Sequence, residues 1–241
     1  MRYAIISDIH SNLEALRAVL EHAGVVDGVW CLGDIVGYGP NPNECIELVR
    51  ARGALCVVGN HDYAAIGRLD TADFNPDAAT AAYWTGRQLT PENRRYLEEL
   101  PIQLTQGDFT LVHGSPRYPI WEYILSAYVA SLNLDHFQTQ FCLIGHSHIP
   151  SVFRCPEGER RCEVEELLPK LSLQTLDRLI INPGGVGQPR DGDPRAAYAI
   201  LDTDARILYH FRVPYDIAMT QQKMREAGLP RRLIERLSYG L

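Results

Sequence analysis

"RYAIISDIHSN", residues 2–12, carries the first copy of the pattern that decides the fold. Its apolar half is a short continuous run, as expected for a strand buried on both faces, and the run ends at Asp8. Apolar residues at near-helical spacing follow over residues 13–23, where a preceding Ser-Asn pair can cap the helix and Gly24 can end it. A strand followed directly by a helix is the first half of a βαβ unit.

The same pattern occurs again within roughly the first 60 residues. A strand over residues 28–33 leads to a helix over residues 41–53, and a further strand over residues 54–59 ends at Asn60. Repeated strand-then-helix units predict an α/β fold, with parallel strands and right-handed crossovers in this half of the chain.

The remaining chain divides into a helical middle, a strand-rich second half and a helical end. Two helical segments over residues 70–100 are predicted to pack over one end of the sheet. Two short helices are predicted within residues 214–241, and we therefore expect one domain over residues 1–213 followed by a tail. The later strands are expected within residues 109–114, 141–146, 151–155, 178–184, 196–202 and 205–213, the last two forming a hairpin.

Composition excludes several classes of protein. The chain has 241 residues, enough for one large domain with a sizeable core, and a formal net charge of −7. Such an acidic balance argues against binding duplex nucleic acid, which needs a basic surface, but it allows a small anionic substrate at a local cationic site. No apolar run approaches the roughly 18 residues of a membrane span, and no signal-type N-terminus is present. We expect a cytoplasmic protein without a membrane partner.

The six cysteines contain no C-x-x-C pair. Cys31, Cys56 and Cys142 lie within apolar runs and are expected to act as small buried hydrophobes. Cys155 and Cys162 flank a charged loop and are able to pair. A reducing compartment argues against that bond, so we predict that both thiols stay free.

Side chains able to bind a metal follow nearly every predicted strand. In chain order they are Asp8 and His10, then Asp34, then Asn60, His61 and Asp62, then His113, and finally His146 and His148. Each motif alone is typical of an ordinary turn or helix cap. The occurrence of all of them, each after one of five apolar runs, is not expected by chance and indicates a shared site. Ligand sites of parallel sheets lie outside the carboxyl ends of the strands, so these side chains are expected to converge.

Their chemistry indicates the kind of metal. Carboxylate, amide and imidazole groups without any cysteine suit Mn, Fe, Zn or Ni, of which we favour Mn, rather than a structural zinc held by thiolates. About seven ligands are too many for one ion and divide sensibly between two, with one carboxylate as a bridge. Glycines before Asp34, Asn60 and His146 allow tight turns and close backbone approach.

The ordered motifs D-x-H, G-D, G-N-H-D, H-G and G-H-x-H resemble the five blocks of the calcineurin-like metallophosphoesterase superfamily, over about residues 1–213. The stretch "NPGGVGQPR", residues 182–190, resembles a loop of the small bacterial phosphoesterases in that superfamily. The resemblance implies a two-sheet β-sandwich flanked by helices, with a dinuclear metal site at the strand ends.

The resemblance also implies a role for each ligand. One set would hold the first ion, a second set the second ion, and a carboxylate would bridge them. By position these are Asp8, His10 and His148 for the first ion, Asn60, His113 and His146 for the second, and Asp34 for the bridge.

Two further residues resemble catalytic groups of the family. His61 is similar to its non-ligand histidine, which faces the scissile phosphate, and Asp62 resembles the partner that orients this histidine. Two ions about 3.5–4 Å apart can hold a bridging hydroxide at neutral pH, and we predict that this hydroxide attacks phosphorus. His61 would stabilise the equatorial charge or protonate the leaving alkoxide.

The substrate is less sharply indicated. Protein serine/threonine phosphatases and the similar diadenosine tetraphosphatases carry an arginine shortly after the G-D block, where this chain has Gly37 and Tyr38. We therefore favour phosphodiester bonds of a small substrate, with a phosphomonoesterase, a protein-phosphatase-like enzyme or a dinucleoside polyphosphate hydrolase as alternatives. Arg117 and Arg190 are candidate substrate contacts, because guanidinium forks suit phosphate oxygens, although both also fit solvated loop positions.

Two other classes compete with an enzyme of this kind. A non-catalytic metal-binding scaffold is disfavoured because every ligand position and His61 are filled. A nuclease on long nucleic acid is disfavoured by the acidic balance. The apolar positions of residues 214–241 fit either packing on the body or contact with a second copy, so a homo-oligomer stays open.

Overall fold

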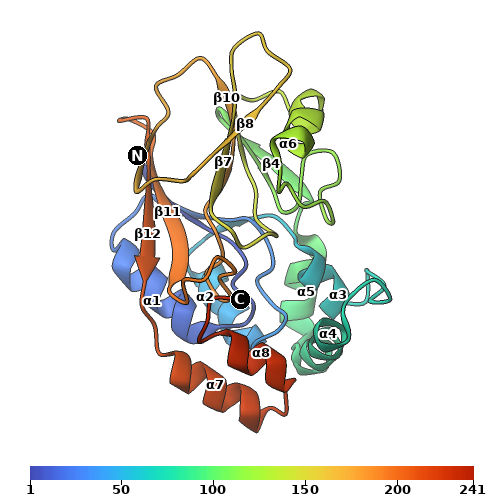
Figure 1. The fold of residues 1–241 in the computed structure, drawn as a ribbon. Coiled ribbons are helices and arrows are strands. Elements are labelled where there is room, and N and C mark those ends of the chain that lie inside the picture. The colour runs from blue at the N-terminus through green and yellow to red at the C-terminus, as the bar shows by residue number, and fades with distance from the viewer.

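The computed structural model describes residues 1–241 and shows two six-stranded sheets packed face to face, with helices on their outer sides (Figure 1). Strand order is β3-β2-β1-β11-β12-β9 in the first sheet and β4-β5-β6-β10-β7-β8 in the second. Both sheets mix parallel and antiparallel pairs. The prediction of an α/β fold with two mixed sheets flanked by helices is confirmed.

The bounds of the elements are as follows. The first sheet contains β1 (Arg2–Ile6), β2 (Gly28–Cys31), β3 (Leu55–Cys56), β9 (Lys170–Ser172), β11 (Ala196–Asp202) and β12 (Ile207–Val213). The second contains β4 (Gln103–Gln106), β5 (Phe109–Val112), β6 (Phe141–Leu143), β7 (Ser151–Cys155), β8 (Glu163–Glu165) and β10 (Arg178–Asn182). The helices are α1 (Leu13–Ala23), α2 (Pro42–Ala51), α3 (Asn60–Ala65), α4 (Pro76–Gln88), α5 (Pro91–Glu99), α6 (Ala127–Asn133), the 3₁₀ turn η1 (Leu134–His136), α7 (Ile217–Glu226) and α8 (Arg231–Arg236).

The N-terminal half follows the predicted strand-helix units. β1 pairs in parallel with β2, and β2 with β3, through crossovers that contain α1 and α2. Asn12 caps α1, because its side-chain oxygen accepts the Ala15 N–H at 3.2 Å. Parallel strands bring their carboxyl ends to the same edge of the sheet, and this edge carries the first predicted ligands.

Apolar side chains fill the sandwich in layers, which explains why β1 is a continuous apolar run. Ile5 points between the two sheets, where it belongs to one cluster with Leu143. Its neighbour Ile6 points to the other face and belongs to a cluster with Leu16 of α1. A strand covered on both faces has no polar side, and each buried side chain of this size stabilises the fold by about 1.5–3 kcal/mol.

Several short elements were not predicted from the sequence. β4, β8 and β9 lie at sheet edges and expose most of their side chains, so they lack an apolar pattern. β3 has only two residues, and Asn60 begins helix α3 instead of merely ending a strand. The hairpin of β11 and β12 is confirmed.

The two helical segments within residues 70–100 are α4 and α5, capped by the side chains of Asn75 and Thr90. α7 and α8 follow β12 and lie at the lower end of the molecule, below α1 and α2 (Figure 1). Apolar side chains of α7 and α8 form one cluster with Tyr38 and with α4. The tail therefore packs on the body, while the division into a domain and a tail stays a prediction.

The prediction of free thiols at Cys155 and Cys162 is wrong, because the two residues form a disulfide. Cys155 ends β7 and Cys162 lies just before its partner β8, so the hairpin brings the two side chains together. Cys31, Cys56 and Cys142 are free and buried, as predicted. None of the helices is long and apolar enough to span a membrane.

Candidate metal centre

Seven buried side chains from five strand ends meet at one edge of the sandwich. Each belongs to the segment that directly follows a strand, and three of the strands come from the first sheet and two from the second. None is more than 3% exposed: Asp8, His10, Asp34, Asn60, His113, His146 and His148. The convergence predicted from the sequence therefore occurs.

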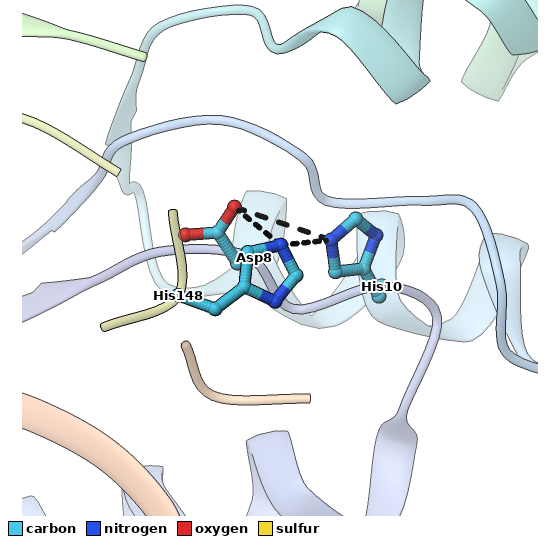
Figure 2. A group of neighbouring side chains, drawn as sticks. All are labelled: Asp8, His10 and His148. Atoms are coloured by element: carbon cyan, nitrogen blue, oxygen red, sulfur yellow. Dashed lines mark hydrogen bonds and ion pairs between the residues drawn. The ribbon is translucent and has the colours of Figure 1, made fainter. Parts of the chain in front are cut away.

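The first group consists of Asp8, His10 and His148, which point toward one another (Figure 2). The Nε2 atoms of the two imidazoles are 3.1 Å apart. The Asp8 Oδ1 atom lies 3.3 Å from Nε2 of His148 and 4.0 Å from Nε2 of His10. Three potential ligand atoms thus surround one point.

The backbone determines which nitrogen each histidine presents. Nδ1 of His10 donates to the Val36 carbonyl at 3.2 Å, and Nδ1 of His148 donates to the Gln188 carbonyl at 2.5 Å. With the proton on Nδ1, both Nε2 atoms carry lone pairs and face each other. A cation between them can bind both lone pairs. Metal-binding histidines are commonly oriented in this way, by a carbonyl that accepts from the other ring nitrogen.

The second group consists of Asp34, His113 and His146. Nδ1 of His113 donates to the Leu32 carbonyl at 2.8 Å, so its Nε2 again carries a lone pair. That Nε2 lies 3.0 Å from the side-chain oxygen of Asn60 and 3.3 Å from Oδ2 of Asp34. Atoms that all accept hydrogen bonds meet here, and a cation satisfies all of them.

Asp34 lies between the two groups. Its Oδ2 is buried and has no hydrogen-bond partner, and it is 3.6 Å from Nε2 of His10 in the first group and 3.3 Å from Nε2 of His113 in the second. Its Oδ1 accepts the backbone N–H of His61 at 2.8 Å. An orphaned buried carboxylate oxygen reaching both groups fits a bridging ligand, and the whole donor set fits two divalent ions.

The charges agree with this arrangement. Burial opposes ionisation of Asp34, but the neighbouring histidines, His113 first among them, hold the pKa of Asp34 well below its usual range. Burial lowers the pKa of His10, His146 and His148 well below the usual value, so these imidazoles are neutral. His113 differs: burial lowers its pKa, but the Asp34 carboxylate outweighs burial and raises the pKa of His113 to about 9, so a metal must displace a proton there. Ionised carboxylate and neutral imidazole are the protonation states in which these groups bind metals.

Tight backbone turns hold these side chains in place. Seven of the eight non-glycine residues with positive φ belong to the site loops: Asp8, His10, Ser11, Asp34, Tyr38, His146 and His148. Gly59 and Gly145 permit close approach, because a Cβ at Gly59 would lie 2.0 Å from Oδ1 of Asp34 and one at Gly145 would lie 2.0 Å from Oγ of Ser7. The predicted need for glycine before Asn60 and His146 is confirmed.

His61 lies beside the first group without belonging to either group. Its ring centroid is 5.0 Å from that of His10, 4.3 Å from Tyr38 and 4.8 Å from Phe74. Its Nδ1 is buried without a partner, and burial lowers the pKa of His61 to about 4. His61 belongs to neither ligand group, and its catalytic role stays a prediction.

Asp62 does not orient His61 by direct contact, contrary to the implied role. Its two carboxylate oxygens accept the backbone N–H groups of Val36 at 3.0 Å and Gly59 at 2.9 Å, and neither bonds to the His61 ring. Asp62 instead connects the loop after β2 to the start of α3. It positions Asp34 and His61 through the backbone.

The two candidate arginines differ. Arg117 forms an ion pair with Glu122 through two nitrogens, so its guanidinium is already satisfied. Arg190 forms no ion pair, donates to the side-chain oxygen of Gln188 at 2.9 Å and reaches the hydroxyl of Tyr38 at 3.4 Å. Arg190 therefore stays a substrate-contact candidate, and the structure does not favour Arg117.

An aromatic wall lies on the side of the second group; sequence reasoning raised Trp121 as a stacking candidate but missed Tyr123. Tyr123 stacks on His146 with ring centroids 3.8 Å apart, and the Trp121 carbonyl accepts from Nε2 of His146 at 3.2 Å. Both aromatic residues are partly exposed. They follow the H-G block within one aromatic-rich segment, the only signal in the sequence that could have indicated them.

Comparison with known proteins agrees with the geometry. The model of the calcineurin-like phosphoesterase superfamily domain matches residues 1–206. The chain belongs to this superfamily. It is 42% identical to an uncharacterized protein of Methanocaldococcus jannaschii, over 98% of this chain and 97% of that one.

Solved structures show the same calcineurin-like fold. The crystal structure of a metallophosphoesterase from Sphaerobacter thermophilus is 53% identical with a TM-score of 0.91, covering 100% of this chain and 99% of that one.

A weaker sequence similarity, 30% identity over 48% of this chain and 44% of the other, is found with a symmetrical bis(5'-nucleosyl)-tetraphosphatase of Dechloromonas aromatica.

Proposed function

We propose that this metallophosphoesterase hydrolyses phosphodiester bonds of a small substrate at two divalent ions, with manganese as the favoured metal. The observation that carries the proposal is Oδ2 of Asp34, buried, unpaired and within 3.6 Å of both histidine groups. When bound, the two ions supply positive charge for the phosphate oxygens and activate water at neutral pH.

The protein's own side chains bind and orient around that centre. Asp8, His10 and His148 would hold one ion, and His113, His146 and Asn60 the other, with Asp34 shared. His61 would hydrogen-bond the phosphate or give a proton to the leaving oxygen through Nε2, because its Nδ1 is buried against Gly37 and no protein group bonds to Nε2. General acid assistance of this kind contributes about 10²–10⁴-fold in rate.

The surroundings of His61 support a diester. Tyr38 and Phe74 cover the imidazole with aromatic rings, at 4.3 and 4.8 Å between centroids. An apolar wall suits the second organic group of a diester better than the extra charged oxygen of a monoester.

A second candidate, hydrolysis of monoesters or dinucleoside polyphosphates, is favoured by Arg190. Its guanidinium approaches the Tyr38 hydroxyl from the loop after β10, at 3.4 Å, and can supply the phosphate-binding charge that the segment after the G-D block lacks. The partial similarity to a symmetrical bis(5'-nucleosyl)-tetraphosphatase supports the same alternative.

Metal-free protein assayed with bis-p-nitrophenyl phosphate and with p-nitrophenyl phosphate, before and after addition of Mn²⁺, tests the proposal. We expect cleavage only with metal and a higher kcat/KM for the diester. Preference for the monoester would support the second candidate. If two ions bind and neither compound is cleaved, the protein is not a diesterase of broad specificity. Assays with small natural diesters would then distinguish an enzyme of narrow specificity from a non-catalytic scaffold.

A further inference from the structure

The segment that follows His113 leaves one histidine of the second metal group and returns to support another. It runs from Gly114 to Tyr123, directly after β5. The Trp121 carbonyl accepts Nε2–H of His146 at 3.2 Å, and the Tyr123 ring stacks on the same imidazole with centroids 3.8 Å apart. With the proton on Nε2, His146 presents only Nδ1 to an ion. The position of this segment therefore determines where the lone pair of His146 points.

Side chains must hold this segment in place, because it contains no helix and no strand. One carboxylate, that of Glu122, collects the contacts that do so, and it belongs to the residue directly after Trp121. Its Oε2 accepts the hydroxyl of Ser115 and the side-chain amide of Asn133, each at 2.8 Å. Its Oε1 forms the ion pair with Arg117, whose Nε also lies 3.4 Å from Oε2. Glu122 thus connects both ends of the segment.

This network is buried although it belongs to a loop. Ser115 and Asn133 are 0% exposed, and the side chains of Glu122 and Arg117 are only 15% and 25% exposed. Burying a carboxylate costs free energy unless donors satisfy it, and here an ion pair and two hydrogen bonds do so. Asn133, at the end of α6, also accepts the backbone N–H of Arg117 at 2.9 Å. Arg117 therefore fixes the loop, which explains why its guanidinium is not free for a substrate.

We propose that Glu122 is a positioning residue for the second metal ion, acting through the carbonyl of the adjacent Trp121 and through His146. Partners that orient a metal-binding histidine typically contribute about 10–100-fold in metal affinity. The first group does not depend on this segment, because the carbonyls of Val36 and Gln188 orient its imidazoles. The inference rests on the two ions of the proposed function, but not on the choice of ester, and it predicts that only one ion depends on Glu122.

Manganese binding to the full chain, measured by calorimetry and by metal content, tests this role without requiring turnover. Glu122→Gln removes the charge that holds Arg117 and keeps the size of the side chain. We expect it to weaken one ion about 10–100-fold and to leave the other unchanged. Retained binding of that other ion shows that the variant has folded. Arg117→Lys, which keeps the charge but loses the planar fork, should weaken the same ion by a smaller factor.

Two double variants identify the weakened ion, at a free Mn²⁺ concentration that just saturates the wild type. Glu122→Gln combined with His146→Ala should still bind one ion, because both substitutions act on the second group. Glu122→Gln combined with His10→Ala should bind none, because each substitution acts on a different group. A general loss of packing would weaken both ions alike and would produce no such difference. If Glu122→Gln does not fold, the same combinations with Arg117→Lys decide.

Asp177→Asn is the matched control. Asp177 pairs with Arg154 at 3.0 Å, and the two side chains are 25% and 24% exposed, much as in the pair of Glu122 and Arg117. Asp177 lies just before β10, which runs parallel to β6, so it is at the end of these strands opposite to His146. This variant should bind both ions with wild-type affinity.

Unchanged Mn²⁺ affinity in Glu122→Gln, or equal weakening of both ions, would overturn the positioning role. So would the loss of the ion that depends on His10 in place of the one that depends on His146. A wild-type chain that binds fewer than two ions would overturn this inference together with the proposed function. Two bound ions without cleavage of any ester would overturn the proposed function alone.

Discussion

Asp34 is the residue on which both metal groups depend. Its Oδ2 has no hydrogen-bond donor in the protein and reaches histidines of both groups. We expect Asp34→Ala to bind neither ion stoichiometrically and to lose activity, because both groups lose their shared negative charge. Metal content by mass spectrometry, together with the diester assay, checks this.

Asp73→Ala serves as its control, because Asp73 is exposed and makes no side-chain hydrogen bond or ion pair. The control should keep both ions. Retention of two ions by Asp34→Ala would refute the bridging role.

Substitution of His61 should lower turnover without changing metal binding. It lies beside His10 but ligates in neither group. We expect His61→Ala to keep both ions and to lower kcat by about 10²–10⁴-fold, the usual contribution of a general acid. His136→Ala, at an exposed histidine far from the ligand motifs, should change neither quantity. Full activity in His61→Ala would remove this residue from the mechanism.

At the scale of single residues, the sequence predicted which side chains converge but not the backbone groups that orient them, and their role as ligands stays a prediction. Aspartate and histidine after successive apolar strands were sufficient to indicate the ligands, because strand ends converge whatever the details. The carbonyls of Leu32, Val36 and Gln188 that orient the imidazoles could not be predicted, since every residue has one. The bonds of Asp62 to backbone N–H groups escaped prediction for the same reason.

Helix α8 is the element that joins the tail to the site. Leu237 at its end is buried against the cluster of Tyr38 and lines the cavity beside His10. We expect Leu237→Ala to lower the free energy of unfolding by about 2–4 kcal/mol through lost burial and an added cavity. Urea denaturation measures it.

Leu241→Ala is the comparison within the same segment, because its side chain is 56% exposed. It should change the free energy of unfolding by less than about 0.5 kcal/mol. Equal effects of the two substitutions would show that the tail does not pack as described.

Among the elements, long amphipathic helices and buried strands were predicted and edge strands were not. α1 and α4 have clear caps and apolar faces, so their sequences determine them locally. β8 and β9 are three residues long and mostly exposed, and they exist because a neighbouring strand offers hydrogen bonds. The place where the tail packs depends on Tyr38, a contact between distant parts of the chain.

In the whole molecule, the metal centre connects the two sheets. Asp8, His10 and Asp34 follow strands of the first sheet, whereas His113, His146 and His148 follow strands of the second. Ions bound only by the folded chain stabilise it by about 2.7 kcal/mol at a hundredfold excess over Kd. We expect chelation to lower Tm by about 5–10 °C, measured by scanning calorimetry.

Asp34→Ala is the control for that experiment, since a protein without ions should not respond to the chelator. Readdition of Mn²⁺ should restore the wild-type Tm. An unchanged Tm after verified removal of both ions would contradict the cross-linking role.

The left-handed residues of the site loops also carry a cost in folding stability. An αL conformation costs a non-glycine residue roughly 1–2 kcal/mol, and seven such positions surround the metals. At Ser11, glycine would relieve that cost without removing a ligand. The site loops therefore hold their side chains in place at the expense of folding stability.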